Sequence, residues 1–189
     1  DRRLALLDAL GDEANGTFLE PVVKEEVERC DVARASYFVA RRKLDPDGNV
    51  RALAELQRVV TRHRESKNAN RHLLNLADLY REAGLPEAEG LYREAEAHLE
   101  KAHDPYALGL VHLGLARLGA KGSLERARAL FQEGGGPGEL AEWHLVAGRL
   151  CGRPEHFEEA LRLAEKAGAG RLLLLARLEL FLKAPSPGE

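Results

Sequence analysis

Isoleucine and methionine are absent from the 189 residues, and only 5% of the residues are aromatic. Because β-strands favour β-branched and aromatic side chains, this shortage argues against a fold built on a β-sheet. The commonest residues are instead leucine (34) and alanine (28), which are both strong helix formers. The composition therefore predicts an all-α fold.

Cysteines and long apolar runs are also scarce. The two cysteines, Cys30 and Cys151, lie far apart and neither belongs to a C-x-x-C motif, which excludes a disulfide framework and a zinc-finger motif. Two reduced thiols fit a cytoplasmic protein. The longest apolar run, residues 172–176, is far shorter than the ~20 residues of a membrane span, so we expect no membrane partner.

A strong net charge is missing as well. The formal net charge is −3, which excludes a generally basic nucleic-acid-binding protein. Charge is nevertheless segregated, because residues 41–72 hold nine Lys and Arg against four acids, whereas residues 73–104 hold three against eight. Arg51, Arg58 and Arg62 are spaced seven and four apart and share one helix face. This basic face could hold a carboxylate-rich peptide or, as the weaker alternative, a nucleic-acid backbone; equally, the basic and acidic segments could pair internally.

No pattern of catalytic or metal-binding residues stands out. The seven histidines are dispersed, and the glycine-rich stretch 134–138 lacks the Lys-Ser/Thr ending and the preceding strand of a phosphate-binding loop. No serine lies in a nucleophile elbow. We therefore expect a protein that is not an enzyme and that uses no cofactor or metal.

Helix-breaking residues punctuate the chain at intervals that suit helix pairs. Breaks containing Pro or Gly fall at 45–48, 84–86, 104–105, 134–138, 153–154 and 168–170. Apolar residues between the breaks recur at helical spacing, as at Leu53, Leu56 and Val60. Helices are expected to open at Asn70, Tyr106, Glu139 and Arg171, which are 36, 33 and 32 residues apart. This interval is typical of repeats made of two helices.

Small residues recur within these expected repeats. Each expected second helix carries a small residue, then an aromatic or small residue four positions later, and another small residue seven positions after the first. These sets are Ala88, Tyr92 and Ala95; Ala127, Phe131 and Gly134; and Ala160, Ala164 and Ala167. The first helices carry Ala77, Gly114 and Gly148. Helix axes come within 8–10 Å of each other only where the side chains at the crossing are short, so these positions are expected to mark close crossings.

This pattern resembles the tetratricopeptide repeat. The segments that carry the resemblance are 137–168, 70–102 and 106–134, with a fainter copy at 32–66. The resemblance implies a right-handed superhelix of stacked antiparallel helix hairpins, an α-solenoid. We expect N-terminal helices over 1–45, which form either a degenerate repeat or a weak helix-turn-helix, then the repeat array over 46–184 and a tail at 185–189.

The resemblance also implies a function. In similar proteins the first helices line a concave groove that holds a segment of a protein partner, and such arrays often serve as docking or sensor arms of larger bacterial regulatory proteins. A chain that begins at Asp1 without Met fits an excised arm. The residues expected to line the groove are Asn75, Asp78, Arg81, Leu110, His112, Arg117, His144 and Arg149.

Two alternative functions stay open. Residues 22–44 resemble the recognition part of a bacterial helix-turn-helix, with short polar residues followed by Arg41, Arg42 and Lys43, although Asp31 rather than Gly stands at the turn. This alternative makes the protein a DNA-binding transcriptional regulator. The other alternative is a scaffold for secretion or pilus assembly.

The last expected helix, from Arg171 to Lys183, leaves hardly any polar stripe. The closing helix of a solenoid normally turns a polar face to water. This helix therefore either packs deeply on the preceding hairpin or forms an interface, and Leu178 and Phe181 are the residues we expect at a homodimer or partner surface.

Overall fold

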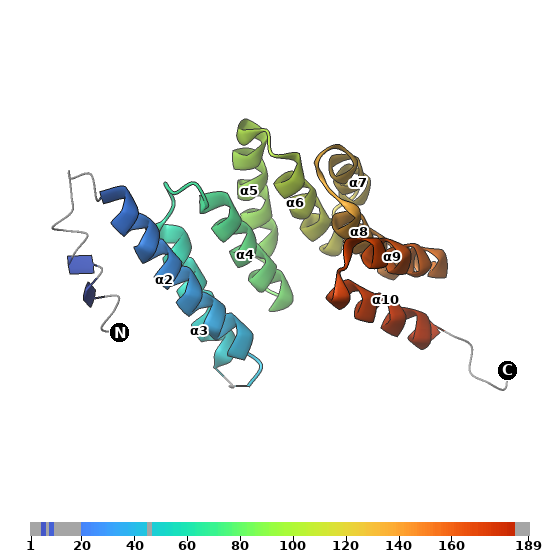
Figure 1. Ribbon diagram of the computed structural model, residues 1–189, viewed down its shortest axis with the longest axis horizontal. Helices are drawn as coiled ribbons and strands as arrows, with labels where there is room; N and C mark the ends of the chain where they lie inside the picture. Colours follow the sequence, from blue (N-terminus) through green and yellow to red (C-terminus); the bar gives the residue numbers. More distant parts are fainter. Residues whose placement is uncertain (1–4, 7, 10–19, 45–46, 184–189) are drawn as a thin grey trace. The chain divides into compact units, whose positions relative to one another are not determined.

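The computed structural model describes residues 5–6, 8–9, 20–44 and 47–183, and the regular secondary structure of these residues is entirely helical (Figure 1). This confirms the all-α expectation. The helices are α2 (Glu20–Arg41), α3 (Gly48–Arg62), α4 (Ala69–Glu82), α5 (Ala88–Ala102), α6 (Pro105–Arg117), α7 (Ser123–Gly134), α8 (Pro137–Cys151), α9 (Pro154–Ala167) and α10 (Gly170–Lys183). The expected tail at 185–189 and most of residues 1–19 lie outside the described residues.

The chain divides into two compact units, Asp1–Ala88 and Glu89–Glu189. In unit 1, α2 packs on α3 and α3 packs on α4. Helix α3 buries Ala52, Leu56 and Val59, which lie four and three residues apart and so share one helix face. From α2 to α4, helices adjacent in the chain are therefore neighbours in space.

Unit 2 continues the same order of packing. Helices α6 and α7 pack on each other, as do α8 and α9, and α10 packs on α9. The first helices of successive pairs also touch, because α8 contacts both α6 and α10. One buried cluster joins the two pairs, with Leu113 from α6, Phe131 from α7 and Trp143 from α8.

Local signals in the sequence explain where these helices begin and end. The Asp104 carboxylate accepts a hydrogen bond from the backbone N–H of Ala107 at 3.0 Å, and Pro105 occupies the first turn of α6, so the helix starts at this point. Helices α8 and α9 end at Gly152 and Gly168, whose φ angles of 72° and 64° are ones that glycine adopts without strain.

Glycine allows helices to cross closely in unit 2. A Cβ built on Gly148 would lie 2.6 Å from a ring carbon of Phe157, and one built on Gly114 would lie 2.3 Å from the ring of Tyr92. Both glycines were expected to mark close crossings, and both do. The Phe157 ring belongs to α9, the partner of α8, whereas Tyr92 comes from α5, which precedes α6.

Candidate functional site

Helix α10 is anchored to α8 and α9 along one side. Ala176 is fully buried in a cluster with Leu145, Phe157 and Ala160. Leucines of α10 pack around this cluster at positions 172, 175 and 180. The Arg149 side chain of α8 donates a hydrogen bond from Nε to Glu179 Oε1 at 2.6 Å. These contacts fix which side of α10 is exposed.

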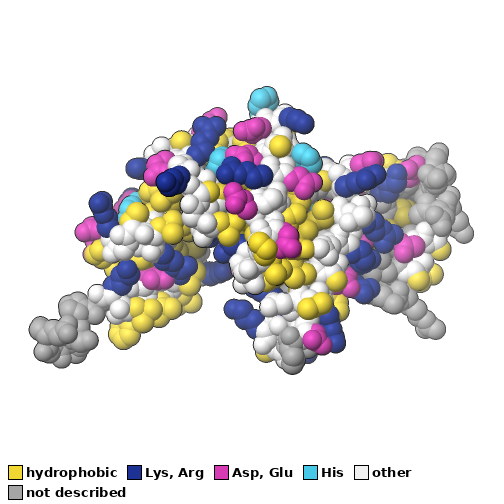
Figure 2. Space-filling model, turned by 180° about the vertical axis from the view of Figure 1, so that it is seen from behind, with side chains coloured by type: hydrophobic (Ala, Val, Ile, Leu, Met, Phe, Trp, Pro, Cys, Tyr) yellow, Lys and Arg dark blue, Asp and Glu magenta, His cyan; other side chains and the backbone are white. Residues whose placement is uncertain are grey.

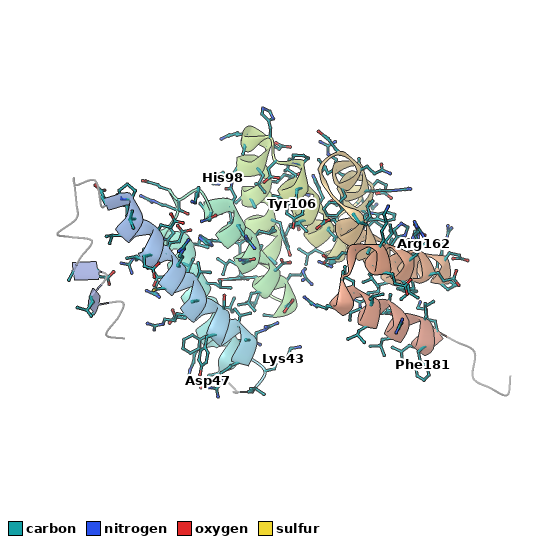
Figure 3. The ribbon with its side chains drawn as sticks, viewed as in Figure 1. Lys43, Asp47, His98, Tyr106, Arg162 and Phe181 are labelled. Atoms are coloured by element: carbon teal, nitrogen blue, oxygen red, sulfur yellow. The ribbon has the colours of Figure 1, made fainter. Side chains whose placement is uncertain are left out.

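The opposite side of α10 presents four large apolar side chains to solvent. These residues, called the α10 face below, are Leu174 (71% exposed), Leu178 (53%), Phe181 (77%) and Leu182 (67%). Figure 3 shows Phe181 pointing away from α9, and in Figure 2 hydrophobic side chains gather around α10 at the lower left of the view. One side of α10 thus packs on the preceding hairpin, as one of the two alternatives predicted, and its other side is exposed.

A shared register relates the α10 face to buried positions in α6 and α8. Counted from the first residue of each helix, the fifth, ninth and twelfth positions hold Gly109, Leu113 and Ala116 in α6, Ala141, Leu145 and Gly148 in α8, and Leu174, Leu178 and Phe181 in α10. In α6 and α8 the ninth residue packs against the second helix of its pair, on Phe131 or Phe157. The exposed fraction of this ninth residue is 0% in α6, 3% in α8 and 53% in α10. Among the described residues, no second helix covers the corresponding side of α10.

The charged side chains around the α10 face are mainly basic. Arg171 and Arg177 are exposed on α10 beside this face, whereas the Lys183 ammonium lies over the Phe157 ring of α9, 5.4 Å from the ring centroid. Arg177 lies 3.9 Å from Glu165 of α9, and both of these side chains are largely exposed. The single carboxylate of α10, Glu179, is already engaged with α8. The apolar face is thus flanked by two arginines, one of which also lies beside Glu165.

The predicted groove residues on α4 lie in unit 1. Asn75 is exposed, whereas Asp78 and Arg81 are half-buried and form an ion pair of 3.3 Å along the helix. On α6, Leu110 packs against the buried cluster that joins α6, α7 and α8. These positions are thus partly used by internal packing.

His112 of α6 is buried, and its Nε2 lies 3.3 Å from Glu96 of α5. Its Nδ1 atom has no hydrogen-bond partner among the described residues. Burial lowers the pKa of His112 below its usual value, and the Glu96 carboxylate only partly opposes this effect. The buried ring therefore favours the neutral form.

Two further predicted groove residues form ion pairs between first helices. Arg117 of α6 donates to Glu142 of α8 at 2.7 Å, and Arg149 of α8 donates to Glu179 of α10 at 2.6 Å. From α6 to α8 and from α8 to α10, each step between first helices is therefore linked by one arginine–glutamate pair. The structure brings these residues together along α6, α8 and α10, as their shared register suggests.

His144, the remaining groove residue, belongs to an aromatic cluster that the sequence analysis missed. Its Nδ1 lies 3.0 Å from Nδ1 of His156 on α9, so one ring must donate and the other accept. The Trp143 ring lies edge-on to both imidazoles, and the Arg128 guanidinium lies over the indole. Burial and the neighbouring His156 lower the pKa of His144. The two histidines are twelve residues apart, a spacing that predicts no contact unless the α8–α9 crossing is known.

The predicted basic face of α3 is turned largely toward α2. Asp31 of α2 is fully buried and accepts hydrogen bonds from Arg58 at 2.7 Å and Arg62 at 3.3 Å. His63 Nε2 lies 2.9 Å from the same carboxylate. Arg51 is exposed near the start of α3. Arg58 and Arg62 thus pair internally with an acid of α2, and Arg42 of the same basic segment pairs with Glu82 of the acidic segment 73–104.

The segment that resembles a helix-turn-helix forms one continuous helix. Helix α2 runs without a break from Glu20 to Arg41, so the turn that this motif needs at Asp31 is not formed. Residues 22–44 contain no Gly or Pro that would break the helix, and Asp31 within it is fully buried and accepts a hydrogen bond from Arg58 of α3. The expectation of a turn at Asp31 is corrected accordingly.

The described residues also form a pocket that is small for a ligand-binding site. A pocket of about 160 Å³ lies between the end of α2 and the start of α3, lined by Tyr37, Phe38, Arg41, Leu44, Gly48 and Arg51. Small-molecule sites usually enclose roughly 300–1,000 Å³.

Within the described ranges, no three or more His, Cys, Asp or Glu side chains cluster so as to hold a metal ion. In the same part of the chain, every helix is too short or too polar to traverse a lipid bilayer.

No protein-family model, curated protein or solved structure matches the chain. The geometry of the chain itself is therefore what points to a function.

Proposed function

We propose that the chain is a non-catalytic protein-binding module, the docking arm of a larger regulatory protein, built from tetratricopeptide-like helix hairpins in a right-handed superhelix. Two features of unit 2 support this proposal. Successive helix pairs touch through their first helices, which is the contact pattern of α-solenoids. Glycine against an aromatic ring allows the close crossing within the α8–α9 pair.

The observation that carries the proposal is the exposed α10 face. Large apolar side chains grouped on one surface and flanked by charge are typical of protein–protein interaction sites. The same register positions in α6 and α8 are buried by a second helix. The α10 face is therefore a surface of the same kind as the interfaces that hold unit 2 together, left open to a partner.

The groove residues remain a separate prediction. A partner bound there would compete with the ion pairs that Arg117 and Arg149 make with the next first helix. The α10 face presents no such competition, because its four side chains are apolar. We therefore assign the main binding role to the α10 face.

A comparison of two variants tests this function. Leu178→Asp places a charge at the centre of the α10 face, while Leu44→Asp makes the same change at a leucine of unit 1 that is 77% exposed. The native chain is immobilised to retain binding proteins from a cell lysate. A retained protein is purified, and its Kd is measured with the native chain, with Leu178→Asp and with Leu44→Asp.

We expect Leu178→Asp to weaken the purified complex by about 30-fold or more, because burying one leucine contributes about 2 kcal/mol. Leu44→Asp should leave the Kd unchanged. An equal Kd for the native and Leu178→Asp chains would overturn the assignment of binding to the α10 face.

A further inference from the structure

The occupant of the α10 face can be deduced from the helices that cover the equivalent positions elsewhere in unit 2. The fifth, ninth and twelfth positions of α6 and α8 are covered by α7 and α9, which are helices of 12 and 14 residues. Helix α7 brings Ala127 and Phe131 to this contact, and α9 brings Phe157 and Ala160. An amphipathic helix of about the same length fits the side of α10 that lacks such a cover.

The sizes of the α10 side chains specify the occupant further. At the fifth and twelfth positions α6 and α8 carry only glycine or alanine, and aromatic rings of α7 and α9 fill the space beside Gly109 and Gly148. Helix α10 carries Leu174 and Phe181 at these positions. An occupant must therefore offer small residues where α7 and α9 offer aromatic rings, since two bulky rows cannot approach to 8–10 Å.

Charge decides between a foreign helix and a second copy of this chain. Exposed Arg171 and Arg177 flank the face, and Glu179 is already paired with Arg149. Two copies of α10 packed face to face would bring basic residues against basic residues. A partner helix with glutamate or aspartate beside its apolar stripe would instead meet opposite charges.

We propose that the α10 face binds an acidic amphipathic helix of a partner protein, whose small and leucine-sized residues pack on the face and whose carboxylates pair with its flanking arginines. This inference rests on the proposed protein-binding function and names the partner's chemistry. Of the two interfaces left open by the sequence, a homodimer and a partner surface, it favours the partner surface, because the charges beside the face are not self-complementary.

Two synthetic helical peptides of about 18 residues, or five turns, test the proposal. Both carry the same stripe of alanine and leucine, flanked by glutamate in one and by lysine in the other. Calorimetric titration into the full chain should show that the glutamate peptide binds about fivefold more tightly, as two exposed charge pairs provide. This preference should shrink as salt is added.

Two variants assign the binding to the face. Leu178→Asp should abolish binding of the glutamate peptide, and Leu44→Asp should not change it. Arg177→Gln should remove part of the preference for glutamate over lysine while leaving the apolar contact. Circular dichroism shows whether each variant keeps its helices. Binding that is unaffected by Leu178→Asp would overturn the proposal.

Other occupants give different results. Equal binding of the two peptides would overturn the acidic partner and leave the protein-binding function standing. A dimer in sedimentation that Leu178→Asp dissociates, with no binding of either peptide, would identify a second copy as the occupant. Binding to phosphatidylserine vesicles and to neither peptide would identify a lipid surface, and would count against both the inference and the proposed function.

Discussion

Replacing Gly148 with alanine adds a methyl group where α8 and α9 cross. The new Cβ would lie 2.6, 2.8 and 3.0 Å from three ring carbons of Phe157, all shorter than an ordinary van der Waals contact. The ring cannot simply move away, because Phe157 is fully buried in a cluster with Leu145 and Ala160. Protein cores are packed densely enough that such an insertion shifts neighbouring side chains or the helix itself.

Two opposing effects set the magnitude. Alanine is favoured over glycine within a helix by about 1 kcal/mol. Overpacking a filled core costs about 1–3 kcal/mol. We therefore expect Gly148→Ala to lower the free energy of unfolding by about 1 kcal/mol. Gly90 of α5 is the matched control, since it is exposed and nothing lies within 4 Å of a Cβ built on it. Gly90→Ala should raise the free energy of unfolding by about 0.4–1 kcal/mol.

Urea unfolding followed by far-ultraviolet circular dichroism measures both changes. Changing Phe157 to leucine as well should reduce the cost of Gly148→Ala, because the two side chains compete for one space. A Gly148→Ala chain that is stabilised as much as Gly90→Ala would refute the close crossing, and with it the register that relates α8 to α10.

Two further predictions concern buried polar groups. Asp31→Asn should lower the free energy of unfolding by about 3 kcal/mol, since it leaves the arginines of α3 facing a neutral amide. In the same urea assay, the control Glu25→Gln at an exposed position should change the free energy of unfolding little. Because burial lowers the pKa of His112, the unfolded chain binds more protons below about pH 6.5, and stability should fall as the pH drops through this range. His112→Leu should make the unfolding midpoint less dependent on pH between 7.5 and 5; an unchanged dependence would contradict the burial of a neutral ring.

Much of the fold follows from the sequence because its signals are local. The breaks at 153–154 and 168–170 bound α9, and the periodic apolar residues between breaks produce the observed helices. Gly148 was identified because small residues recur at matching positions of the first helices, which predicts a close crossing there. The crossing of Gly114 with Tyr92 of α5 could not be assigned, because spacing shows that a crossing exists but not which helix makes it.

The candidate site was predicted less completely. Leu178 and Phe181 were identified from the lack of a polar stripe, but which side of α10 is open depends on contacts with α8 and α9. The row of arginines on α3 is periodic, yet nothing local shows that Asp31, 27 residues before Arg58, is buried against it. Pairs formed by tertiary packing carry no signal at short sequence separation.

The one tryptophan of the chain occupies the joint between two successive helix pairs. The indole N–H of Trp143 donates to the backbone oxygen of Leu124 on α7 at 2.7 Å, while the rings of His144 and His156 border its other edges. Tryptophan fluorescence of the chain therefore comes from this one site, and no extrinsic fluorophore has to be attached. Separation of the two helix pairs would expose the indole to water and shift its fluorescence emission to longer wavelength. The fluorescence of Trp143 therefore reports whether these two pairs stay packed together.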